Sequence, residues 1–382
     1  MFRAVDETKP LVVAPEKPGT YLKFSEIKKS IPEPIREIDG RPLTHQWSFQ
    51  DYLGAFLART SSRRNDYRVA PGLYAFGNPG EDSEVLVSCN YKYSFDLLRK
   101  NIKDKSFWIL VLDTKGINVW CAAGKGTFGT KELIDRIQKT GLIMHVKHRR
   151  LIVPQLGAVG IAAHEIKKAT GFRVSYGPVD LKDLLTYLDN NRKTTPAMRR
   201  VRFNWYDRLV LVPMEVIPVL KHYGKYALVM LLVFGLQSEG FLFQSMLTAA
   251  SLYLAAGFLA IVSGAILTPL FLPILPFRAF AAKGAVAGAA MTAAMLFFLE
   301  KIAPLARLDE NIWFAFFAVS FIPALSSYLA LQFTGSSTYT NMSGVYKEHR
   351  FAIPLYKAAL ALSLFFLIVH KLSLHINFGA IL

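Results

Sequence analysis

The sequence predicts a protein of two parts, a doubly wound α/β domain followed by an all-α transmembrane domain of five helices. Charge is unevenly distributed, since only 10 of the 45 Lys and Arg residues and 6 of the 28 Asp and Glu residues lie at or after Leu209. Short apolar segments alternate with helical patterns before that point, and five apolar stretches of spanning length follow it. A chain of 382 residues has room for both domains.

The α/β prediction depends on apolar runs that alternate with amphipathic segments between Glu84 and Asn190. The expected strands are Glu84–Cys89, Phe107–Asp113, Leu151–Pro154 and Phe172–Tyr176. The expected helices are Tyr91–Asn101, Thr130–Thr140 with Thr130 as its N-cap, Val159–Thr170 and Leu181–Asn190. This order is typical of a doubly wound, Rossmann-like parallel sheet, which binds ligands outside the carboxyl ends of its strands. The loops that follow Asp113, Pro154 and Tyr176 are therefore expected at one rim.

Five stretches are apolar enough, over about 20 residues each, to cross the hydrocarbon core of a bilayer. They are Val216–Leu236, Phe241–Leu267, Ala279–Leu299, Ile312–Phe333 and Ile353–Val369. Gly284 and Gly288 in the third stretch fit either close helix packing or a generic face of small residues. No ionisable residue stands clearly at mid-span, which favours an anchor over an ion-coupled transporter.

The Lys and Arg residues of the short loops predict the orientation in the membrane. The densest basic run, from Arg192 to Arg208, comes directly before the first span. Basic loops face the cytoplasm, so we expect a multi-pass protein of the cell (inner) membrane with a cytoplasmic N-terminal domain and the C-terminus outside. The same placement favours the lipid bilayer over nucleic acid as a partner. The expected division is a lead-in packed on the soluble domain (1–83), the α/β domain (84–190), a basic juxtamembrane linker (191–212) and the five-span domain (213–382).

The cysteine content excludes several kinds of site. The chain has only Cys89 and Cys121, too few for a disulfide framework or for an iron–sulfur cluster held by this chain alone. Cys89 ends an apolar strand and is expected to be a buried structural cysteine. The segment Met1–Lys17 is charged and lacks an apolar core, so we do not expect a signal peptide.

The segment Asn118–Thr130 (NVWCAAGKGTFGT) supports two interpretations. In the first, Gly124, Gly126 and Gly129 form the G-x-G-x-x-G pattern that lets a backbone approach a pyrophosphate. The acidic residue expected about 20 positions later is absent, and the basic run Lys147–Arg150 stands there instead. Because basic side chains could accept a 2′-phosphate, an NADP-binding membrane oxidoreductase is one candidate.

In the second interpretation, Cys121 is a metal ligand or a nucleophile. The small residues Ala122, Ala123 and Gly124 beside it would leave room for a large planar group next to Trp120. Lys125 places a positive charge nearby, which favours the thiolate form. A thiolate is a soft donor suited to a transition metal.

The same thirteen residues resemble the signature of the membrane-bound corrinoid proteins of microbial mercury methylation. That family has a corrinoid-binding domain followed by five membrane spans. The region Glu84–Asn190 is also similar to the large subunit of the corrinoid iron–sulfur protein of acetyl-CoA synthesis, including Leu151–Gly160 (LIVPQLGAVG) and Tyr176–Val179 (YGPV). This chain lacks that relative's four cluster cysteines. It also lacks the D-x-H-x-x-G motif that supplies an axial histidine in many cobalamin enzymes.

The resemblance implies that the cofactor is a corrinoid (cobalamin), with Cys121 as both the catalytic residue and the lower axial ligand of its cobalt. The residues implied around the ring are Asn118, Val119, Trp120, Ala122, Ala123, Gly124, Lys125, Gly126 and Thr127. Gln155, Gly157 and Gly177 are implied to line the groove for the nucleotide tail. No iron–sulfur cluster is expected in this chain.

The activity implied by the resemblance is that of a corrinoid-dependent methyltransferase of anaerobes, which transfers a methyl group to inorganic mercury(II) and forms methylmercury. The implied partners are a ferredoxin with two [4Fe-4S] clusters as electron donor, and a methylated folate or its carrier protein as methyl donor. A corrinoid carrier or sensor without catalytic turnover is an alternative with the same cofactor.

Overall fold

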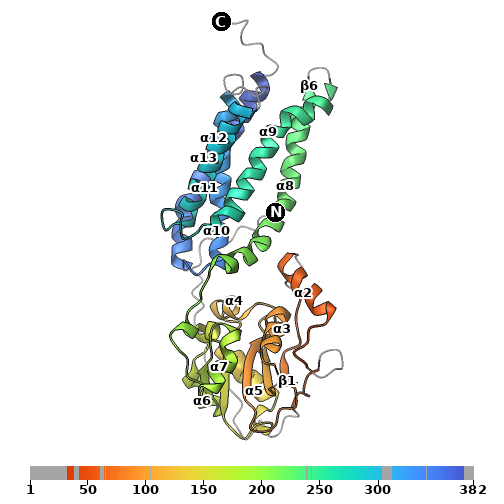
Figure 1. Cartoon of the computed structure of the whole chain (residues 1–382), viewed down its shortest axis with the longest axis vertical. Helices are drawn as coiled ribbons and strands as arrows, with labels where there is room; N and C mark the ends of the chain where they lie inside the picture. Colours follow the sequence, from red (N-terminus) through yellow and green to blue (C-terminus); the bar gives the residue numbers. More distant parts are fainter. Residues whose placement is uncertain are drawn as a thin grey trace. The chain divides into compact units, whose positions relative to one another are not determined.

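The computed structural model describes residues 32–37, 43–60, 64, 66–103, 105–237, 240–241, 243–302, 312–340 and 342–373. These residues divide into two compact units, with the main boundary between Arg200 and Val201 (Figure 1). Residues 1–31 of the predicted lead-in, and the C-terminal end whose location was predicted, lie outside the described residues.

The first unit is built on a five-stranded sheet in the order β1-β3-β2-β4-β5. The strands are β1 (Gly72–Phe76), β2 (Val85–Cys89), β3 (Phe107–Leu112), β4 (Arg150–Val153) and β5 (Arg173–Tyr176). Strands β2 to β5 are parallel, as predicted, but β1 pairs antiparallel with β3. The expectation of a wholly parallel sheet is therefore wrong at this edge, and the mixed sheet begins within the segment predicted as lead-in.

Helices cover both faces of the sheet (Figure 1). They are α2 (Phe49–Thr60), α3 (Lys92–Asn101), α4 (Val119–Gly124), α5 (Thr130–Lys139), α6 (Ala163–Thr170) and α7 (Leu184–Asp189). Short 3₁₀ segments are η2 (Leu142–Met144), η3 (Gln155–Gly160), η4 (Leu181–Asp183) and η5 (Ala197–Arg199). The predicted helix Val159–Thr170 is α-helical only over α6, because η3 precedes it.

Thr130 is the first residue of α5 and not its N-cap, which is Gly129. Its hydroxyl forms hydrogen bonds outside the helix. Thr130 Oγ1 donates to the Gly160 carbonyl at 3.3 Å and accepts from the Ala162 N–H at 2.8 Å. The residue therefore ties the start of α5 to the chain between η3 and α6.

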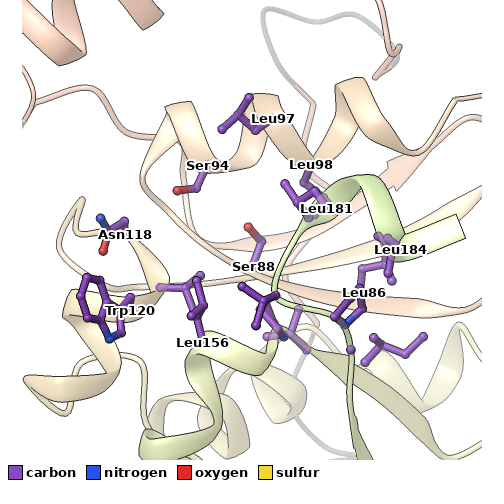
Figure 2. Close-up of a pocket in the computed structure, with 17 residues that line it drawn as sticks. Leu86, Ser88, Ser94, Leu97, Leu98, Asn118, Trp120, Leu156, Leu181 and Leu184 are labelled. Carbon is purple, nitrogen blue, oxygen red and sulfur yellow. The ribbon is translucent and has the colours of Figure 1, made fainter. Parts of the chain in front are cut away.

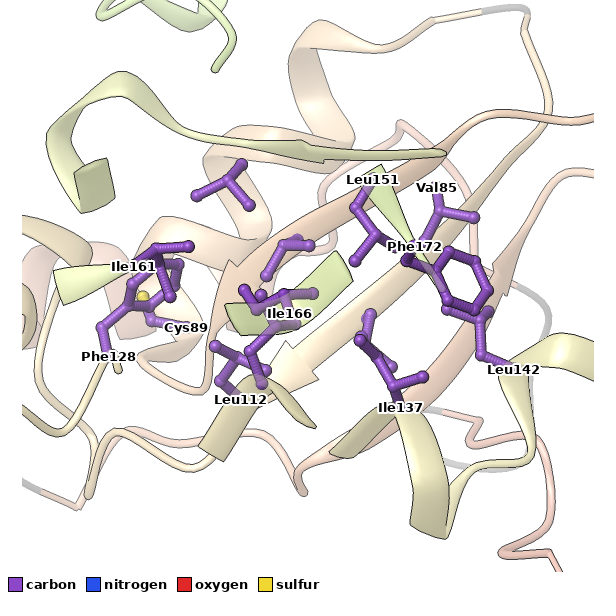
Figure 3. Packing of buried hydrophobic residues seen from close by; sticks show 14 of the residues in the cluster. Val85, Cys89, Leu112, Phe128, Ile137, Leu142, Leu151, Ile161, Ile166 and Phe172 are labelled. Atoms are coloured by element: carbon purple, nitrogen blue, oxygen red, sulfur yellow. The ribbon is translucent and has the colours of Figure 1, made fainter. Parts of the chain in front are cut away.

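The alternation of side chains along each strand divides the interior into two apolar layers. One layer packs strand residues such as Val85, Leu112 and Leu151 against α4, α5 and α6, and it includes Cys89 and Phe128 (Figure 3). The other layer packs Leu86, Ile109 and Ile152 against α3 and α7. Both faces of β2 and β3, and of most of β4, are thus buried, which explains their nearly continuous apolar sequences.

Four charged side chains join α2 to α3. Lys92 Nζ lies 2.6 Å from Asp51 Oδ1 and 2.7 Å from Asp96 Oδ2. Arg99 lies 2.6 Å from Asp51 Oδ2 and 2.9 Å from Asp96 Oδ1. Burial alone would raise the pKa of Asp51, but hydrogen bonds from Lys92, Ser48 and Arg99 outweigh burial and hold that pKa well below its usual range.

We expect Asp51→Asn to destabilise the junction of α2 and α3 by about 1–3 kcal/mol at neutral pH, because it removes one of the two carboxylates that pair with Lys92 and Arg99. A depressed carboxyl pKa stabilises the fold above the unfolded value of about 3.9 and loses that effect as the pH falls below it. The difference between wild type and variant should therefore shrink below about pH 4. Hydrogen–deuterium exchange of α2 and α3 in the full chain measures this difference in local stability.

The control is Asp189→Asn, which removes the exposed ion pair with Lys105. That change should cost between zero and about 1 kcal/mol. Equal effects of the two substitutions on α2 would contradict the assignment.

Among the described residues of the second unit, five helices are long and apolar enough to span a membrane, in agreement with the predicted number. Its helices are α8 (Trp205–Gly235), α9 (Phe243–Ile261), α10 (Thr268–Leu270), α11 (Phe280–Ile302), α12 (Ile312–Gln332) and α13 (Met342–Ser373). A π-helical stretch, Val262–Leu267, joins α9 to α10, and η7 (Phe333–Ser336) follows α12. The short strands β6 (Leu236–Gln237) and β7 (Gly240–Phe241) join α8 to α9.

Helix α8 begins inside the predicted linker. Its N-cap is Asn204, whose side chain accepts from the backbone of Asp207 while the Asp207 carboxylate accepts from the backbone of Asn204. This capping box starts the helix 11 residues before the predicted span, which was set at Val216.

Gly284 and Gly288 let α11 approach α12 closely. A Cβ atom at Gly288 would lie 2.7 Å from Pro323 Cα, and one at Gly284 would lie 2.7 Å from the Ser326 carbonyl oxygen. Ser326 Oγ donates to the Gly284 carbonyl at 2.7 Å. Of the two interpretations of this pair, the structure supports close packing.

We therefore expect Gly288→Leu to lower the stability of the membrane unit by at least about 1–3 kcal/mol through overpacking. Gly224→Leu on α8 is the matched control, because a Cβ there would have nothing within 4 Å. Thermal unfolding of the full chain in detergent compares the two. A control that unfolds as early as Gly288→Leu would rule out a specific contact between α11 and α12.

Candidate functional site

Most of the NVWCAAG segment forms a short helix where a loop was expected. Asn118 is the N-cap of α4, and its Oδ1 accepts from the Cys121 N–H at 2.9 Å. Cys121 thus occupies the third position of the helix, with its backbone fixed by the cap. The side chain of Cys121 is partly exposed.

A buried amide holds the loop that leads from β3 into α4. Asn90 Oδ1 accepts from Thr114 N at 3.1 Å, Thr114 Oγ1 at 2.8 Å and Gly116 N at 2.9 Å. Asn90 Nδ2 donates to Asp113 Oδ1 at 3.1 Å. Asn90 is 3% exposed and Thr114 is fully buried. Sequence reasoning missed Asn90, and the one available signal was a polar residue directly after an apolar strand.

The segment η3 packs against the buried side of α4. Ala122 and Ala123 are buried in the core. A Cβ at Gly160 would overlap the Phe128 carbonyl oxygen, and one at Gly157 would overlap the Phe128 ring. The two segments that carry the family resemblance, Asn118–Thr130 and Leu151–Gly160, are therefore packed together. The small size of the two alanines serves this contact.

The opposite side of α4 and the turn after it face solvent. Trp120 is 38% exposed, and Gly124, Lys125 and Gly126 are exposed. A Cβ at Gly124 or Gly126 would have nothing within 4 Å, and Gly126 has φ +78°, a conformation that favours glycine. We call this surface, formed by Trp120, Cys121, Gly124, Lys125 and Gly126, the thiol face.

An apolar cavity of about 290 Å³ lies at the carboxyl ends of β2 and β4 (Figure 2). Asn118 and Trp120 stand at one end of it, and Leu181 and Leu184 at the other. The chain passes from β2 outward to β3 and then crosses to β4 on the other side of β2. The cavity therefore lies at the topological switch point, where open α/β sheets bind ligands.

The predicted site residues fall into three places. Asn118, Val119, Trp120 and Gly177 line the cavity. Cys121, Gly124, Lys125 and Gly126 belong to the thiol face. The remaining predicted residues line neither, and they are Ala122, Ala123, Thr127, Gln155 and Gly157.

The lining that sequence reasoning missed consists mainly of apolar residues. Examples are Leu86, Leu98, Ile152 and Leu156, together with the hydroxyl of Ser88. Nothing in the sequence distinguishes such residues from those of an ordinary core. Pro154 and Leu156 take the places expected for Gln155 and Gly157.

The dinucleotide interpretation meets two geometric difficulties. The glycine pattern does not follow a strand directly, because the whole of α4 lies between β3 and Gly126. The basic run Lys147–Arg150 ends at the start of β4, so it lies at the amino ends of the parallel strands, opposite the rim that carries α4. Lys147 and Arg150 also pair with Glu81 and Glu84.

Comparison with known proteins finds relatives of the first unit. The family described as CO dehydrogenase/acetyl-CoA synthase delta subunit matches residues 60–188. The acetyl-CoA decarbonylase/synthase complex subunit gamma of Methanothermobacter thermautotrophicus is 31% identical over 148 residues, which are 38% of this chain and 32% of that protein. The subunit gamma of Archaeoglobus fulgidus is 32% identical over 133 residues, 34% of this chain and 27% of that protein.

This chain therefore spans about a third of the length of these curated relatives or less. The matched residues 60–188 include β1, which agrees with a sheet that begins before Glu84.

We expect a maleimide to modify one thiol per folded chain, and that thiol is Cys121. Cys89 is fully buried, and burial raises the pKa of its thiol. Mass spectrometry after a short pulse should find Cys121 modified in the native protein and both cysteines modified after denaturation. Cys121→Ser should abolish the native modification, and rapid labelling of Cys89 would contradict its placement.

Proposed function

We propose that the first unit binds a corrinoid with the Cys121 thiolate as the lower ligand of its cobalt, and that the protein transfers a methyl group to mercury(II). The observation that carries this proposal is the thiol face, which presents a single soft donor beside open glycine positions. The matched relatives are named as subunits of an acetyl-CoA decarbonylase/synthase complex, and the matching family model lies within this unit at residues 60–188.

The residues present fit a large planar group. Gly124 and Gly126 leave space next to Cys121 that any side chain would occupy. Among the described residues, no group of three or more His, Cys, Asp or Glu side chains could hold a metal ion. A metal bound to Cys121 would therefore bring its other ligands with it, as the cobalt of a corrinoid does.

In this proposal the residues around Cys121 have distinct roles. Asn118 fixes the turn that carries the thiolate, and Trp120 shields one side of it. Lys125 is exposed nearby, where its ammonium group could donate hydrogen bonds to the amide side chains of a corrinoid. Ala122, Ala123 and Gly157 act indirectly, since they seat α4 on η3.

The cavity is the proposed site of the nucleotide tail. Its lining is almost entirely apolar, which suits a heteroaromatic base. Gly177 forms part of one wall and packs closely there, since a Cβ at this position would lie 3.2 Å from Ile152 Cγ2. Trp120 belongs to both the cavity and the thiol face, so one ligand with a flat ring and a tail could occupy both places.

The bound corrinoid would supply the methyl group, and a thiolate below its metal favours release of that group to a soft electrophile such as mercuric ion. This chain's part is to hold the ligand, orient it and leave its upper side accessible. Repeated turnover requires an external reductant, for which we propose a ferredoxin with two [4Fe-4S] clusters. A methylated folate or its carrier protein is the proposed methyl donor.

The cofactor assignment is tested with the full chain purified in detergent and reconstituted with cobalamin. We expect about one cobalt per chain in the wild type, and a visible spectrum that Cys121→Ala shifts. Methylmercury formation should fall at least about 100-fold in the variant, because the thiolate no longer donates to the metal. Cys89→Ala is the control and should keep both the spectrum and the activity. An unchanged spectrum in Cys121→Ala would exclude axial ligation.

The same preparation separates the alternatives. A corrinoid carrier or sensor would bind cobalt and yet retain its methyl group when mercuric ion is added. An NADP-binding membrane oxidoreductase would lack cobalt and show nicotinamide-dependent activity. The position of Lys147–Arg150 at the amino ends of the strands argues against this last alternative.

A further inference from the structure

The membrane unit contains a second cavity, of about 630 Å³, that the proposed methyl transfer does not use. Its walls come from the start of α11, the end of α12 and the first turns of α13. These segments lie at the same end of the helical bundle as the start of α8, since consecutive spans alternate in direction. The chain enters the bundle at that end, directly after the basic run Arg192–Arg208. It is therefore the end predicted to face the cytoplasm.

Two cations and one carboxylate line this cavity. Glu348 is already engaged, because its Oε2 accepts from the Ala281 N–H at the start of α11 at 3.0 Å. Arg278 and Lys347 are exposed, and neither pairs with a carboxylate of a described residue. The cavity therefore offers two positive charges to a ligand.

The rest of the lining is mainly apolar. Ala281, Ala282 and Ala285 form one wall, and Phe351 lies among the other lining residues. Ser327 Oγ donates to the Ala281 carbonyl at 2.7 Å and lies 2.8 Å from Tyr356 Oη. These hydrogen bonds link α11, α12 and α13 and leave the hydroxyl groups occupied. The remaining space thus suits hydrocarbon.

We infer that this cavity binds an anionic phospholipid, with its phosphate at Arg278 and Lys347 and its apolar part along the alanine wall. The volume lies within the roughly 300–1,000 Å³ typical of small-molecule sites. Basic pockets between transmembrane helices on the cytoplasmic side bind anionic lipid headgroups in other membrane proteins. A zwitterionic lipid would bring an extra cation toward Arg278 and Lys347, which pair with no carboxylate among the described residues, and is disfavoured.

Native mass spectrometry of the delipidated full chain in detergent tests this inference, with phosphatidylglycerol, phosphatidylcholine and inorganic phosphate as probes. We expect one phosphatidylglycerol per chain, bound at least about tenfold more tightly than phosphatidylcholine. Arg278→Gln combined with Lys347→Gln should abolish that preference. Lys221→Gln combined with Lys225→Gln on α8 removes the same charge outside the cavity and should leave the preference unchanged.

A second pair of variants tests the cavity independently of charge. Ala285→Phe fills the cavity and should weaken phosphatidylglycerol binding, whereas Ala290→Phe, at an exposed position of α11 outside the cavity lining, should not. Equal binding of the two lipids, or equal losses in variant and control, would overturn the inference. Competition by inorganic phosphate at equal concentration would show a phosphate site and not a lipid site.

Discussion

The arrangement of the candidate site depends on one buried amide. Asn90 directly follows β2, and its side chain accepts hydrogen bonds from the backbone N–H groups of Thr114 and Gly116. The loop after β3 therefore has a single path. Each of these buried N–H groups would otherwise lack a partner, at a cost of about 1–3 kcal/mol. The path of the loop fixes where α4 begins, and the Asn118 cap then fixes the backbone of Cys121. A thiol on a mobile loop would lack this preorganisation.

The position of α4 also depends on close packing against η3. Phe128 follows the helix, and its ring and carbonyl oxygen lie where side chains at Gly157 and Gly160 would be. The glycines of the LGAVG segment therefore matter mainly for packing, although the resemblance placed Gly157 in a ligand groove. Short segments that share a family signature can be adjacent in space for reasons of support as well as of binding.

The strands β2, β3 and β4 were predictable from sequence because each is a largely buried apolar run, and β5 (RVSY) was predictable from its place in the alternation of strands and helices. The five spans were predictable because hydropathy depends on composition alone. Strand β1 was missed because its five residues, GLYAF, follow Pro71 and stand outside the alternation of strands and helices. Helix α4 was missed because six residues that end in a glycine are too few to show a helical periodicity. The cavity could not be predicted, since its lining comes from residues of seven elements that only the tertiary fold brings together.

The geometry bears on the two interpretations of the segment around Cys121. A pyrophosphate site needs the glycines at the turn between a strand and a helix, and here α4 occupies that turn. The basic residues Lys147–Arg150, which would bind the 2′-phosphate, lie at the opposite rim of the sheet. A ligand that uses the thiol face and the cavity needs a flat part, a metal centre for the thiolate and a tail that ends in an apolar group, with Trp120 between them. A corrinoid combines these three features, and a dinucleotide has neither the metal nor the flat macrocycle. The placement of Trp120 between the two surfaces therefore favours the corrinoid interpretation.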